Sequence, residues 1–207
     1  MQQEQKSLLG PQWVNLNMQD ADVWLLQSWL KAETADKLLK HFIERLAWSQ
    51  PNIRMFGKSV PVPRLQAWYG DADASYAYSG IKMVPLAWEK KLLELKRYCE
   101  QTCDTPFNSV LANLYRHGQD SMGMHADNEP ELGEQPVIAS VSLGASRNFD
   151  FKHLSTGEKR RVVLHHGSLL IMRGSTQTFW HHGISKTKRV DTERVNFTFR
   201  YVHGSSN

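Results

Sequence analysis

The sequence predicts an α+β protein, mainly β, with two helices in its first half and a β-rich core in its second half. Two observations lead to this prediction. Apolar residues recur with a helical period in residues 33–48 and 85–102, and this period disappears from about residue 107. From there, short β-rich runs alternate with Gly, Ser, Asn and charged residues, as in sandwiches and barrels. No internal repeat or low-complexity linker divides the chain, so we expect one compact unit.

The first helix is expected in ETADKLLKHFIERLAW, residues 33–48, with Thr34 as its N-cap. Its apolar residues form one stripe of an amphipathic helix, namely Ala35, Leu38, Leu39, Phe42, Ile43 and Leu46. The second helix is expected in PLAWEKKLLELKRYCEQT, residues 85–102. Its apolar residues are Trp88, Leu92, Leu95 and Cys99.

Seven β-rich runs are expected to form the core. They are SVLANLY (109–115), VIASVSLG (137–144), NFDFKH (148–153), RVVLHH (161–166), SLLIM (168–172), TQTFWHH (176–182) and RVNFTFRYV (194–202). The last run alternates strictly, which is typical of a half-buried strand. Its apolar face consists of Val195, Phe197, Phe199 and Tyr201, and its polar face of Arg194, Asn196, Thr198 and Arg200. An arginine at each end of a polar face suggests that this face binds something other than water.

The composition is that of an ordinary soluble globular protein, with 207 residues of which 41% are hydrophobic and 22% charged. The longest apolar runs are far shorter than the roughly 20 residues of a membrane span, and the N-terminus lacks a signal-peptide pattern. Cys99 and Cys103 are expected to be reduced and to fill the core. We therefore expect a monomer that binds no membrane and works inside the cell, in the cytoplasm of a bacterium or the nucleus of a eukaryote.

Positive charge is mild overall but clustered, with a net charge of +4 and a pI near 9.1. GEKRR (157–161), which includes Arg160 and Arg161, and KTKR (186–189) concentrate it at expected turns. These clusters are either solvated loops or contacts for phosphates, which fix the position of a nucleic acid without reading its sequence.

A metal site is suggested by MHADNEPELG and FWHHGI. His125 and Asp127, two residues apart, point the same way in an extended segment. Of His181 and His182, only one can face the same interior on a strand. Two histidines and one carboxylate on one side form the facial triad of non-haem Fe(II) oxygenases. His-x-Asp alone is a weak signal, because a chain with nine histidines contains such pairs by chance.

The arginines of the last strand suit a dicarboxylate such as 2-oxoglutarate, from which iron oxygenases commonly draw two electrons. Guanidinium groups match carboxylates bidentately. The Cα atoms of Arg194 and Arg200 are expected roughly 20 Å apart, so both side chains must lean inward to reach one small diacid. Asn113 and Tyr115 share a face and offer an amide and a phenol; alternatively, they belong to a polar outer face.

NLY, HAD, WHHGI and RVNFTFR, in this order and spacing, resemble the AlkB family of Fe(II)/2-oxoglutarate-dependent nucleic-acid dealkylases. Arg-x-Asn-x-Thr-x-Arg is the most specific motif, and the resemblance runs from about residue 53 to 202. MFGK, PRLQAWYGD, YAYSG and PFNSVLANLY are especially similar to the subgroup containing the second human homologue, which acts on duplex DNA. The resemblance implies a flexible N-terminus (1–14), N-terminal helices with a nucleotide-recognition lid (15–106), and a jelly-roll (double-stranded β-helix) dioxygenase core (107–204).

The same resemblance implies roles for individual residues. His125, Asp127 and His182 would bind Fe(II), with the HGI motif selecting His182 over His181. The residues for 2-oxoglutarate would be Asn113, Tyr115, Arg194, Asn196, Thr198 and Arg200. Arg194 is expected near the distal carboxylate of the co-substrate, and Arg200 near the end that chelates iron.

Substrate contacts are also implied. Tyr78 would stack on a flipped base opposite His125, and Glu129 would contact that base; alternatively, Tyr78 is a core residue and Glu129 a surface charge. Phe56 would push into the duplex as an apolar wedge, with Arg54 and Lys58 beside it for phosphates. The alternative for Phe56 is a core position before a turn glycine.

The activity implied is oxidative demethylation of 1-methyladenine and 3-methylcytosine in DNA. It would use Fe(II), 2-oxoglutarate and O₂ and release formaldehyde, succinate and CO₂. Duplex and single-stranded DNA are the expected partners, with RNA as a further candidate. Two alternatives stay open: the same chemistry on RNA or a protein methyl-lysine, and a non-enzymatic jelly-roll module that binds an anion.

Overall fold

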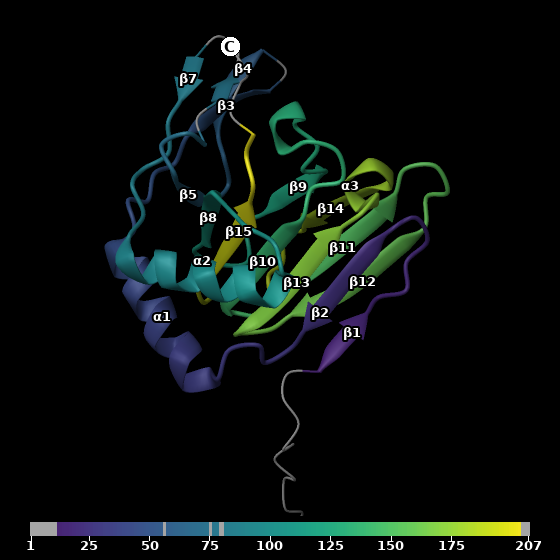
Figure 1. The fold of residues 1–207 in the computed structure, drawn as a ribbon, viewed down its shortest axis with the longest axis horizontal. Coiled ribbons are helices and arrows are strands. Elements are labelled where there is room, and N and C mark those ends of the chain that lie inside the picture. The colour runs from purple at the N-terminus through teal and green to yellow at the C-terminus, as the bar shows by residue number, and fades with distance from the viewer. Residues whose placement is uncertain (1–11, 56, 75, 79–80, 204–207) are drawn as a thin grey trace, which may run out of the picture.

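The computed structural model describes residues 12–55, 57–74, 76–78 and 81–203 (Figure 1). The helices are α1 (Ala32–Arg45), α2 (Lys90–Cys103), the 3₁₀ helix η1 (Pro130–Leu132) and α3 (Thr176–Phe179). The strands of the first half are β1 (Trp13–Asn15), β2 (Asp22–Leu26), β3 (Asn52–Met55), β4 (Lys58–Pro61), β5 (Leu65–Gly70), β6 (Tyr76–Tyr78) and β7 (Ile81–Met83). Those of the second half are β8 (Ser109–Tyr115), β9 (Met122–His125), β10 (Ile138–Gly144), β11 (Arg147–His153), β12 (Lys159–Leu164), β13 (Ser168–Arg173), β14 (Trp180–Ile184) and β15 (Arg194–Arg200).

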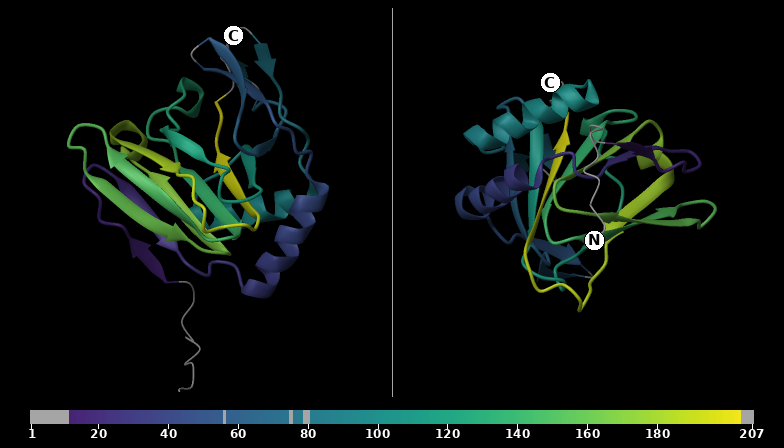
Figure 2. Two further views of the ribbon diagram at one scale, coloured as in Figure 1. Left: turned by 180° about the vertical axis from the view of Figure 1, so that it is seen from behind. Right: turned by 90° about the horizontal axis from the view of Figure 1, so that it is seen from below.

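Two sheets form the core and confirm the predicted jelly roll. The larger has seven strands in the order β1-β2-β13-β10-β15-β8-β5, and the smaller has four in the order β12-β11-β14-β9. All pairings between neighbouring strands in both sheets are antiparallel. Figure 2 shows the two sheets as layers, with the helices outside the larger one. The interior between them is where a binding site can form.

Helices α1 and α2 cover the outer face of the seven-stranded sheet, as Figure 1 shows. The apolar face of β15 packs against this layer, and the rings of Phe42 and Phe197 lie 4.7 Å apart. Burying such a side chain contributes about 1.5–3 kcal/mol. Because the apolar residues of β15 face the helices, its polar residues face the inside of the jelly roll rather than the solvent.

A second apolar cluster fills the space between the sheets, where Leu170 and Met172 of β13 meet Phe149, Phe151 and Trp180 of the smaller sheet. Two separate hairpins, β3–β4 and β6–β7, complete the fold. In Figure 1 they lie at the top of the molecule, above the two sheets. This is the region in which the recognition lid is expected.

The structure differs from the predicted division of the chain at its N-terminal side. Residues 13 and 14, expected to be flexible, belong to β1, and residues 1–11 lie outside the described residues. Strands β2 and β5 from residues 15–106 are integral to the seven-stranded sheet. The jelly roll therefore begins well before residue 107, because long-range pairing recruits short early strands that show no strong period of their own.

The helix boundaries and one strand also differ from expectation. Lys31 is the N-cap of α1, and Thr34 lies inside the helix. Helix α2 starts only at Lys90, where the side chain of Glu89 accepts a hydrogen bond from Leu92 N. In TQTFWHH, residues 176–179 form the short helix α3, and only the part from Trp180 is a strand.

Both cysteines are free and buried, as predicted. Burial raises the pKa of Cys99 well above its ordinary value and that of Cys103 to about 12. Among the described residues, the helices are all too short or too polar to cross a bilayer.

Candidate metal and co-substrate site

The predicted metal ligands come from neighbouring strands of the four-stranded sheet. His125 ends β9, and His182 lies directly opposite it in β14. Gly183 permits this close approach, because a Cβ atom there would lie 2.9 Å from the carbonyl oxygen of Met122 and 3.0 Å from that of Gly123. The glycine of the HGI motif therefore has a packing function in the site.

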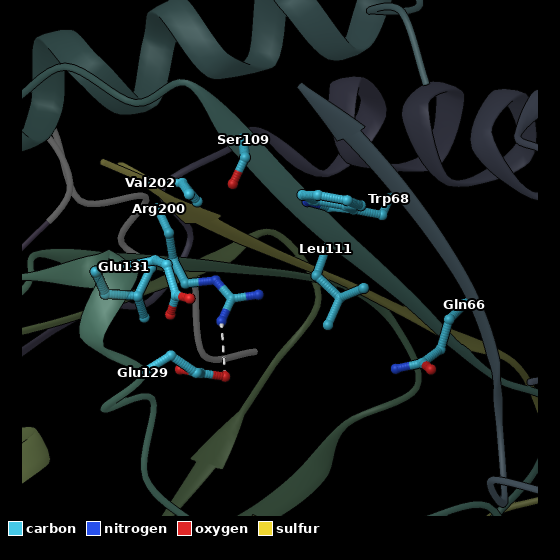
Figure 3. Close-up of a pocket in the computed structure, with 9 residues that line it drawn as sticks. Gln66, Trp68, Ser109, Leu111, Glu129, Glu131, Arg200 and Val202 are labelled. Atoms are coloured by element: carbon cyan, nitrogen blue, oxygen red, sulfur yellow. Dashed lines mark ion pairs between the residues drawn. The ribbon is translucent and has the colours of Figure 1, made fainter. Parts of the chain in front are cut away.

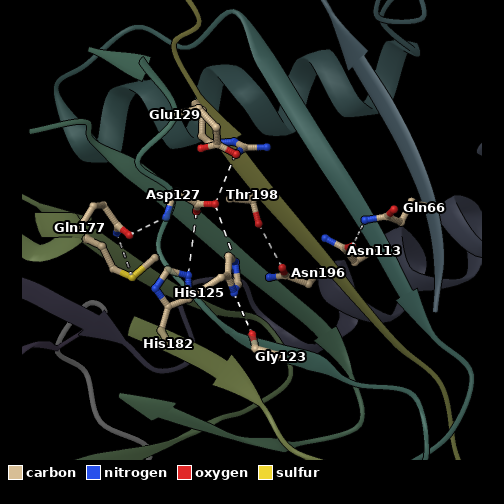
Figure 4. Close-up of polar contacts among 12 residues, drawn as sticks. Gln66, Asn113, Gly123, His125, Asp127, Glu129, Gln177, His182, Asn196 and Thr198 are labelled. Atoms are coloured by element: carbon tan, nitrogen blue, oxygen red, sulfur yellow. Dashed lines mark hydrogen bonds and ion pairs between the residues drawn. The ribbon is translucent and has the colours of Figure 1, made fainter. Parts of the chain in front are cut away.

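The three side chains converge on one point (Figure 4). His125 Nε2 lies 3.8 Å from Asp127 Oδ1, and His182 Nε2 lies 4.0 Å from Asp127 Oδ2. One ligand atom from each of these three residues lies within 4.8 Å of the others. Two imidazole nitrogens and one carboxylate on one side of a cavity suit an Fe(II) ion and leave coordination positions open.

Neighbouring groups fix the orientation of the ligands. His125 Nδ1 lies 2.9 Å from the carbonyl oxygen of Gly123, so this nitrogen carries the proton and Nε2 presents its lone pair. Asp127 N donates to Gln177 Oε1 over 3.0 Å, and the ring of His182 stacks on Phe149 at 5.2 Å. The site is thus held by contacts with the backbone, an amide and an aromatic ring.

The electrostatics favour the protonation states that bind a metal. Burial lowers the pKa of His182 to about 4, although Asp127 opposes this shift. Burial alone would raise the pKa of Asp127, but its interactions with the guanidinium of Arg200, and to a lesser extent with the imidazoles of His182 and His125, outweigh burial and hold the pKa below its usual value. At neutral pH, His182 is therefore neutral and Asp127 ionised, as ligation requires.

The paired histidines of FWHHGI face opposite sides of β14. His182 is buried in the interior, whereas His181 is half-buried and paired with Lys152 of β11. The structure therefore brings His182, as predicted, and not His181, next to Asp127.

Arg194 is the first residue of β15 and lies at the N-terminal end of its polar face. It is 1% exposed, its Nη2 donates to Ser142 Oγ over 2.9 Å, and its guanidinium lies 5.2 Å from the centre of the Tyr115 ring. Its Nε and Nη1 atoms have no hydrogen-bond partner among the described residues. Burial lowers the pKa of Arg194 to about 10. A buried cation without an anion is costly, so this position fits a carboxylate ligand.

Arg200 lies at the other end of this face, beside the candidate metal site. Its Nη1 lies 3.3 Å from Asp127 Oδ1 and 4.0 Å from Glu129 Oε1. Figure 3 shows the pocket next to it, which also holds Trp68, Leu111 and Glu129. A guanidinium between the candidate metal ligand and this pocket can bind an anionic group that reaches the metal.

Asn113, Tyr115, Asn196 and Thr198 line the cavity together with the three candidate metal ligands and Arg200. Asn196 donates to Ser140 Oγ and accepts from Thr198 Oγ1. Sequence reasoning missed two residues here, Arg64 and Gln66, which both donate to Asn113 Oδ1, over 2.8 and 3.0 Å. PRLQAWYGD was named for its similarity to the subgroup, but that resemblance gave no role to Arg64 or Gln66.

The predicted substrate residues are less well defined. Phe56 lies outside the described residues, as do the side chains of Arg54 and Tyr78. Lys58 is exposed in β4. Arg160 and Arg161 of β12 are exposed but form ion pairs with Glu158 and Asp150. The side chain of Glu129 is half-exposed and directed toward Arg200 (Figure 3).

Comparison with known proteins shows the family to which the chain belongs. Residues 22–200 match the 2OG-Fe(II) oxygenase superfamily. The chain belongs to this superfamily. It is 40% identical to the mouse protein named DNA oxidative demethylase ALKBH2, over 94% of this chain and 86% of that protein. The human protein of the same name is 37% identical, over 93% of this chain and 78% of the human protein.

Human alpha-ketoglutarate-dependent dioxygenase alkB homolog 3 is also 37% identical, over 87% of this chain and 66% of that protein. The solved structure of OsALKBH1 has the same fold, with a TM-score of 0.60, 20% identity, and coverage of 86% of this chain and 97% of that chain. As a 2OG-Fe(II) oxygenase, the protein is a dioxygenase that depends on Fe(II), 2-oxoglutarate and O₂. The predicted enzyme class and cofactors are thus confirmed, and the non-enzymatic alternative is disfavoured.

Proposed function

We propose that this 2OG-Fe(II) oxygenase repairs alkylated DNA by oxidative demethylation of 1-methyladenine and 3-methylcytosine. The observation that carries the proposal is the convergence of His125, Asp127 and His182, together with a buried Arg194 that has two nitrogens without a hydrogen-bond partner among the described residues. The relatives named DNA oxidative demethylase, which match over most of this chain, support DNA as the target. The protein would therefore act where DNA is found, in the bacterial cytoplasm or the eukaryotic nucleus.

In this proposal, His125, Asp127 and His182 hold Fe(II), and Arg194 binds the distal carboxylate of 2-oxoglutarate. When bound, the metal and 2-oxoglutarate use O₂ to hydroxylate an N-linked methyl group; 2-oxoglutarate becomes succinate and CO₂, and the hydroxymethyl group leaves as formaldehyde. Asn113 and Tyr115 hold the co-substrate from β8, and Asn196 and Thr198 hold it from β15. The burial of His182 against Phe149 keeps water away from the reacting atoms.

Arg200 has two functions in this proposal. It keeps Asp127 ionised, and it attracts the end of 2-oxoglutarate that approaches the metal. Glu129, on the side of Arg200 away from the metal, offers a carboxylate to a methylated base, which is cationic when its ring nitrogen carries the methyl group. Tyr78 would stack on that base. A methylated base pairs weakly, which lowers the cost of flipping it, a few kcal/mol.

The hairpin β3–β4 would engage the nucleic acid, with Phe56 as a wedge in duplex DNA and Arg54 and Lys58 near phosphates. Arg160 and Arg161 would contribute further phosphate contacts, exchanging their ion pairs with Glu158 and Asp150 for the nucleic acid. Duplex and single-stranded DNA are proposed as substrates of a monomeric enzyme, and RNA as a second candidate.

The test uses the iron-loaded enzyme with 2-oxoglutarate, ascorbate and air. Matched oligonucleotides carry one 1-methyladenine in duplex DNA, single-stranded DNA or RNA, and mass spectrometry follows the loss of one CH₂ unit. We expect loss from both DNA substrates, and a Phe56→Ala variant should lose more activity on the duplex than on the single strand. Succinate formation without demethylation of any oligonucleotide would retain the oxygenase chemistry and overturn the nucleic-acid target. Equal losses on both DNA substrates would contradict the wedge.

A further inference from the structure

Two donors meet at the side-chain oxygen of Asn113. Arg64 Nε lies 2.8 Å and Gln66 Nε2 lies 3.0 Å from Asn113 Oδ1. The convergence follows from the sheet, because Gln66 of β5 is directly paired with Asn113 of β8, and Arg64 immediately precedes β5. The oxygen of this amide is therefore saturated by donors from one side.

This arrangement determines which end of the Asn113 amide faces the cavity. With Oδ1 turned toward Arg64 and Gln66, the Nδ2 group, which carries two N–H donors, points the other way. Figure 4 shows this nitrogen directed toward Asn196, on the side of the candidate co-substrate site. A rotation of the amide by 180° would present an oxygen instead, and an oxygen repels a carboxylate.

Arg64 is an unusual residue to bury in a core. It is 8% exposed, and burial lowers its pKa. Its hydrogen bonds in the described chain go to neutral oxygens: Asn113 Oδ1, and the carbonyl oxygen of Ser121 at 3.2 Å. The carboxylate of Asp120 attracts this charge without a hydrogen bond to it, but burial outweighs the attraction, and such a buried cation destabilises the fold compared with an apolar side chain. A residue of this kind is expected to serve the site rather than the stability of the protein.

The second bond of Arg64 connects the amide to the start of the strand that carries a candidate metal ligand. Ser121 directly precedes β9, which ends at His125, and Ser121 N in turn donates to the carbonyl oxygen of Pro63. Val62, just before Pro63, closes the base of the β3–β4 hairpin through its bond to Pro51 O. Arg64 thus joins the root of this hairpin, the start of β9 and Asn113.

We propose that Arg64 and Gln66 are positioning residues, which orient the amide of Asn113 so that it donates to 2-oxoglutarate. This inference rests on the proposed function only in taking Asn113 as a co-substrate ligand. Neither side chain has to touch the co-substrate. Either donor alone can retain the orientation, so their effects are expected to be redundant.

The experiment measures binding of 2-oxoglutarate to the full-length protein loaded with Mn(II), which binds in place of Fe(II) without turnover. Arg64→Met and Gln66→Leu are compared singly, together, and in an Asn113→Ala background. We expect a small effect of each single change and a loss on the order of thirtyfold for the double variant, as for one hydrogen bond to a charged group. In the Asn113→Ala background the double change should have no further effect. Arg64→Lys combined with Gln66→Leu keeps one donor and should retain part of the affinity that the double variant loses.

Arg45→Met, an exposed change in α1, is the matched control, and the melting temperature of each variant verifies its fold. Equal losses with and without Asn113 would overturn the inference, since Arg64 and Gln66 would then act by another route. Undiminished binding by the double variant would also overturn it, while leaving the proposed function intact. If the unmodified Mn(II)-loaded protein failed to bind 2-oxoglutarate, both the inference and the proposed function would fall.

Discussion

At the scale of single residues, the proposed role of Arg194 in binding a dicarboxylate can be tested by substitution. Two nitrogens of its buried guanidinium, Nε and Nη1, have no hydrogen-bond partner among the described residues, and the planar guanidinium holds its N–H donors in a fixed fork that lysine cannot reproduce. We expect Arg194→Lys to raise the KM for 2-oxoglutarate on the order of tenfold, because the charge stays but the bidentate geometry is lost. Steady-state succinate formation measures this, with Arg189→Lys in an exposed loop as the control. An unchanged KM would remove Arg194 from the co-substrate site.

Gly183 and Gly123 form a matched pair for testing the metal site. A methyl group at Gly183 would press on the backbone of β9, whereas one at Gly123 would meet no atom within 4 Å. Gly183→Ala should therefore separate β14 from β9, cost about 1–3 kcal/mol in stability and weaken Mn(II) binding. Titration with Mn(II) and thermal melting measure the two effects. If Gly123→Ala weakened Mn(II) binding as much as Gly183→Ala, the close approach of the strands would not be the cause.

The two buried cysteines allow a prediction of how thiol alkylation in the native protein depends on pH. Only the thiolate reacts with iodoacetamide, and burial raises the pKa of Cys103 to about 12 and that of Cys99 well above its usual value. Near pH 8 the folded protein should hardly be alkylated, and alkylation should increase as the pH rises toward the raised pKa. In denaturant, both thiols return to ordinary pKa values and should react rapidly. Mass spectrometry monitors the alkylation. Rapid alkylation of the native protein would contradict the buried positions of the two cysteines.

Individual residues of the site differ in how far the sequence predicts them. His125, Asp127, His182 and the two arginines of β15 belong to motifs with a fixed spacing. The structure brings the first three and Arg200 around one cavity, and Arg194 lies buried at the other end of β15, against the ring of Tyr115, which lines that cavity. Their chemical roles stay predictions. Arg64 and Gln66 belong to a stretch that resembles the subgroup, but no role was predicted for them, because their contacts with Asn113 depend on the register between β5 and β8, which only the folded sheet establishes.

At the scale of elements, the start of α2 tests how helix capping contributes to stability. Glu89 accepts a hydrogen bond from Leu92 N with one oxygen and contacts His41 Nε2 with the other, at 3.0 Å. Glu89→Ala should destabilise the protein by about 1 kcal/mol. Thr34→Ala, inside α1 and exposed, should be neutral or slightly stabilising, since alanine is the better helix former. Urea denaturation measures both; the reverse order would mean that Thr34 caps α1 after all.

Sequence patterns also predicted some helices and strands better than others. Strands β8, β10, β11, β13 and β15 were predicted, because each presents apolar residues at a strand period or as a buried run. Strand β2 was missed, since its five residues are stabilised by pairing with β13, far away in sequence. The segment 176–179 was predicted as a strand from its β-branched and aromatic residues, but it forms a turn of helix after β13. Local propensity is weak in such short segments, and tertiary context decides their structure.

At the scale of the whole molecule, metal and co-substrate binding should be linked to folding, because the site joins both sheets. Arg194 lies on the larger sheet, and two of the candidate metal ligands lie on β9 and β14 of the smaller one. A ligand that binds only the folded protein stabilises it by about 2.7 kcal/mol at a hundred times its Kd. For a chain of this size, this corresponds to a rise of roughly 5–10 °C in melting temperature.

Thermal melting with Mn(II), with 2-oxoglutarate and with both can separate the two contributions. We expect Mn(II) and 2-oxoglutarate together to raise the melting temperature more than the sum of the single additions, because in the proposed site 2-oxoglutarate would contact both Arg194 and the metal. Arg194→Met should keep the increment from Mn(II) and lose most of that from 2-oxoglutarate. His125→Ala should lose both, since removal of the metal leaves the co-substrate attached at one end only. An undiminished increment from 2-oxoglutarate in His125→Ala would show that the co-substrate binds away from the triad, and would contradict a single site spanning the two sheets.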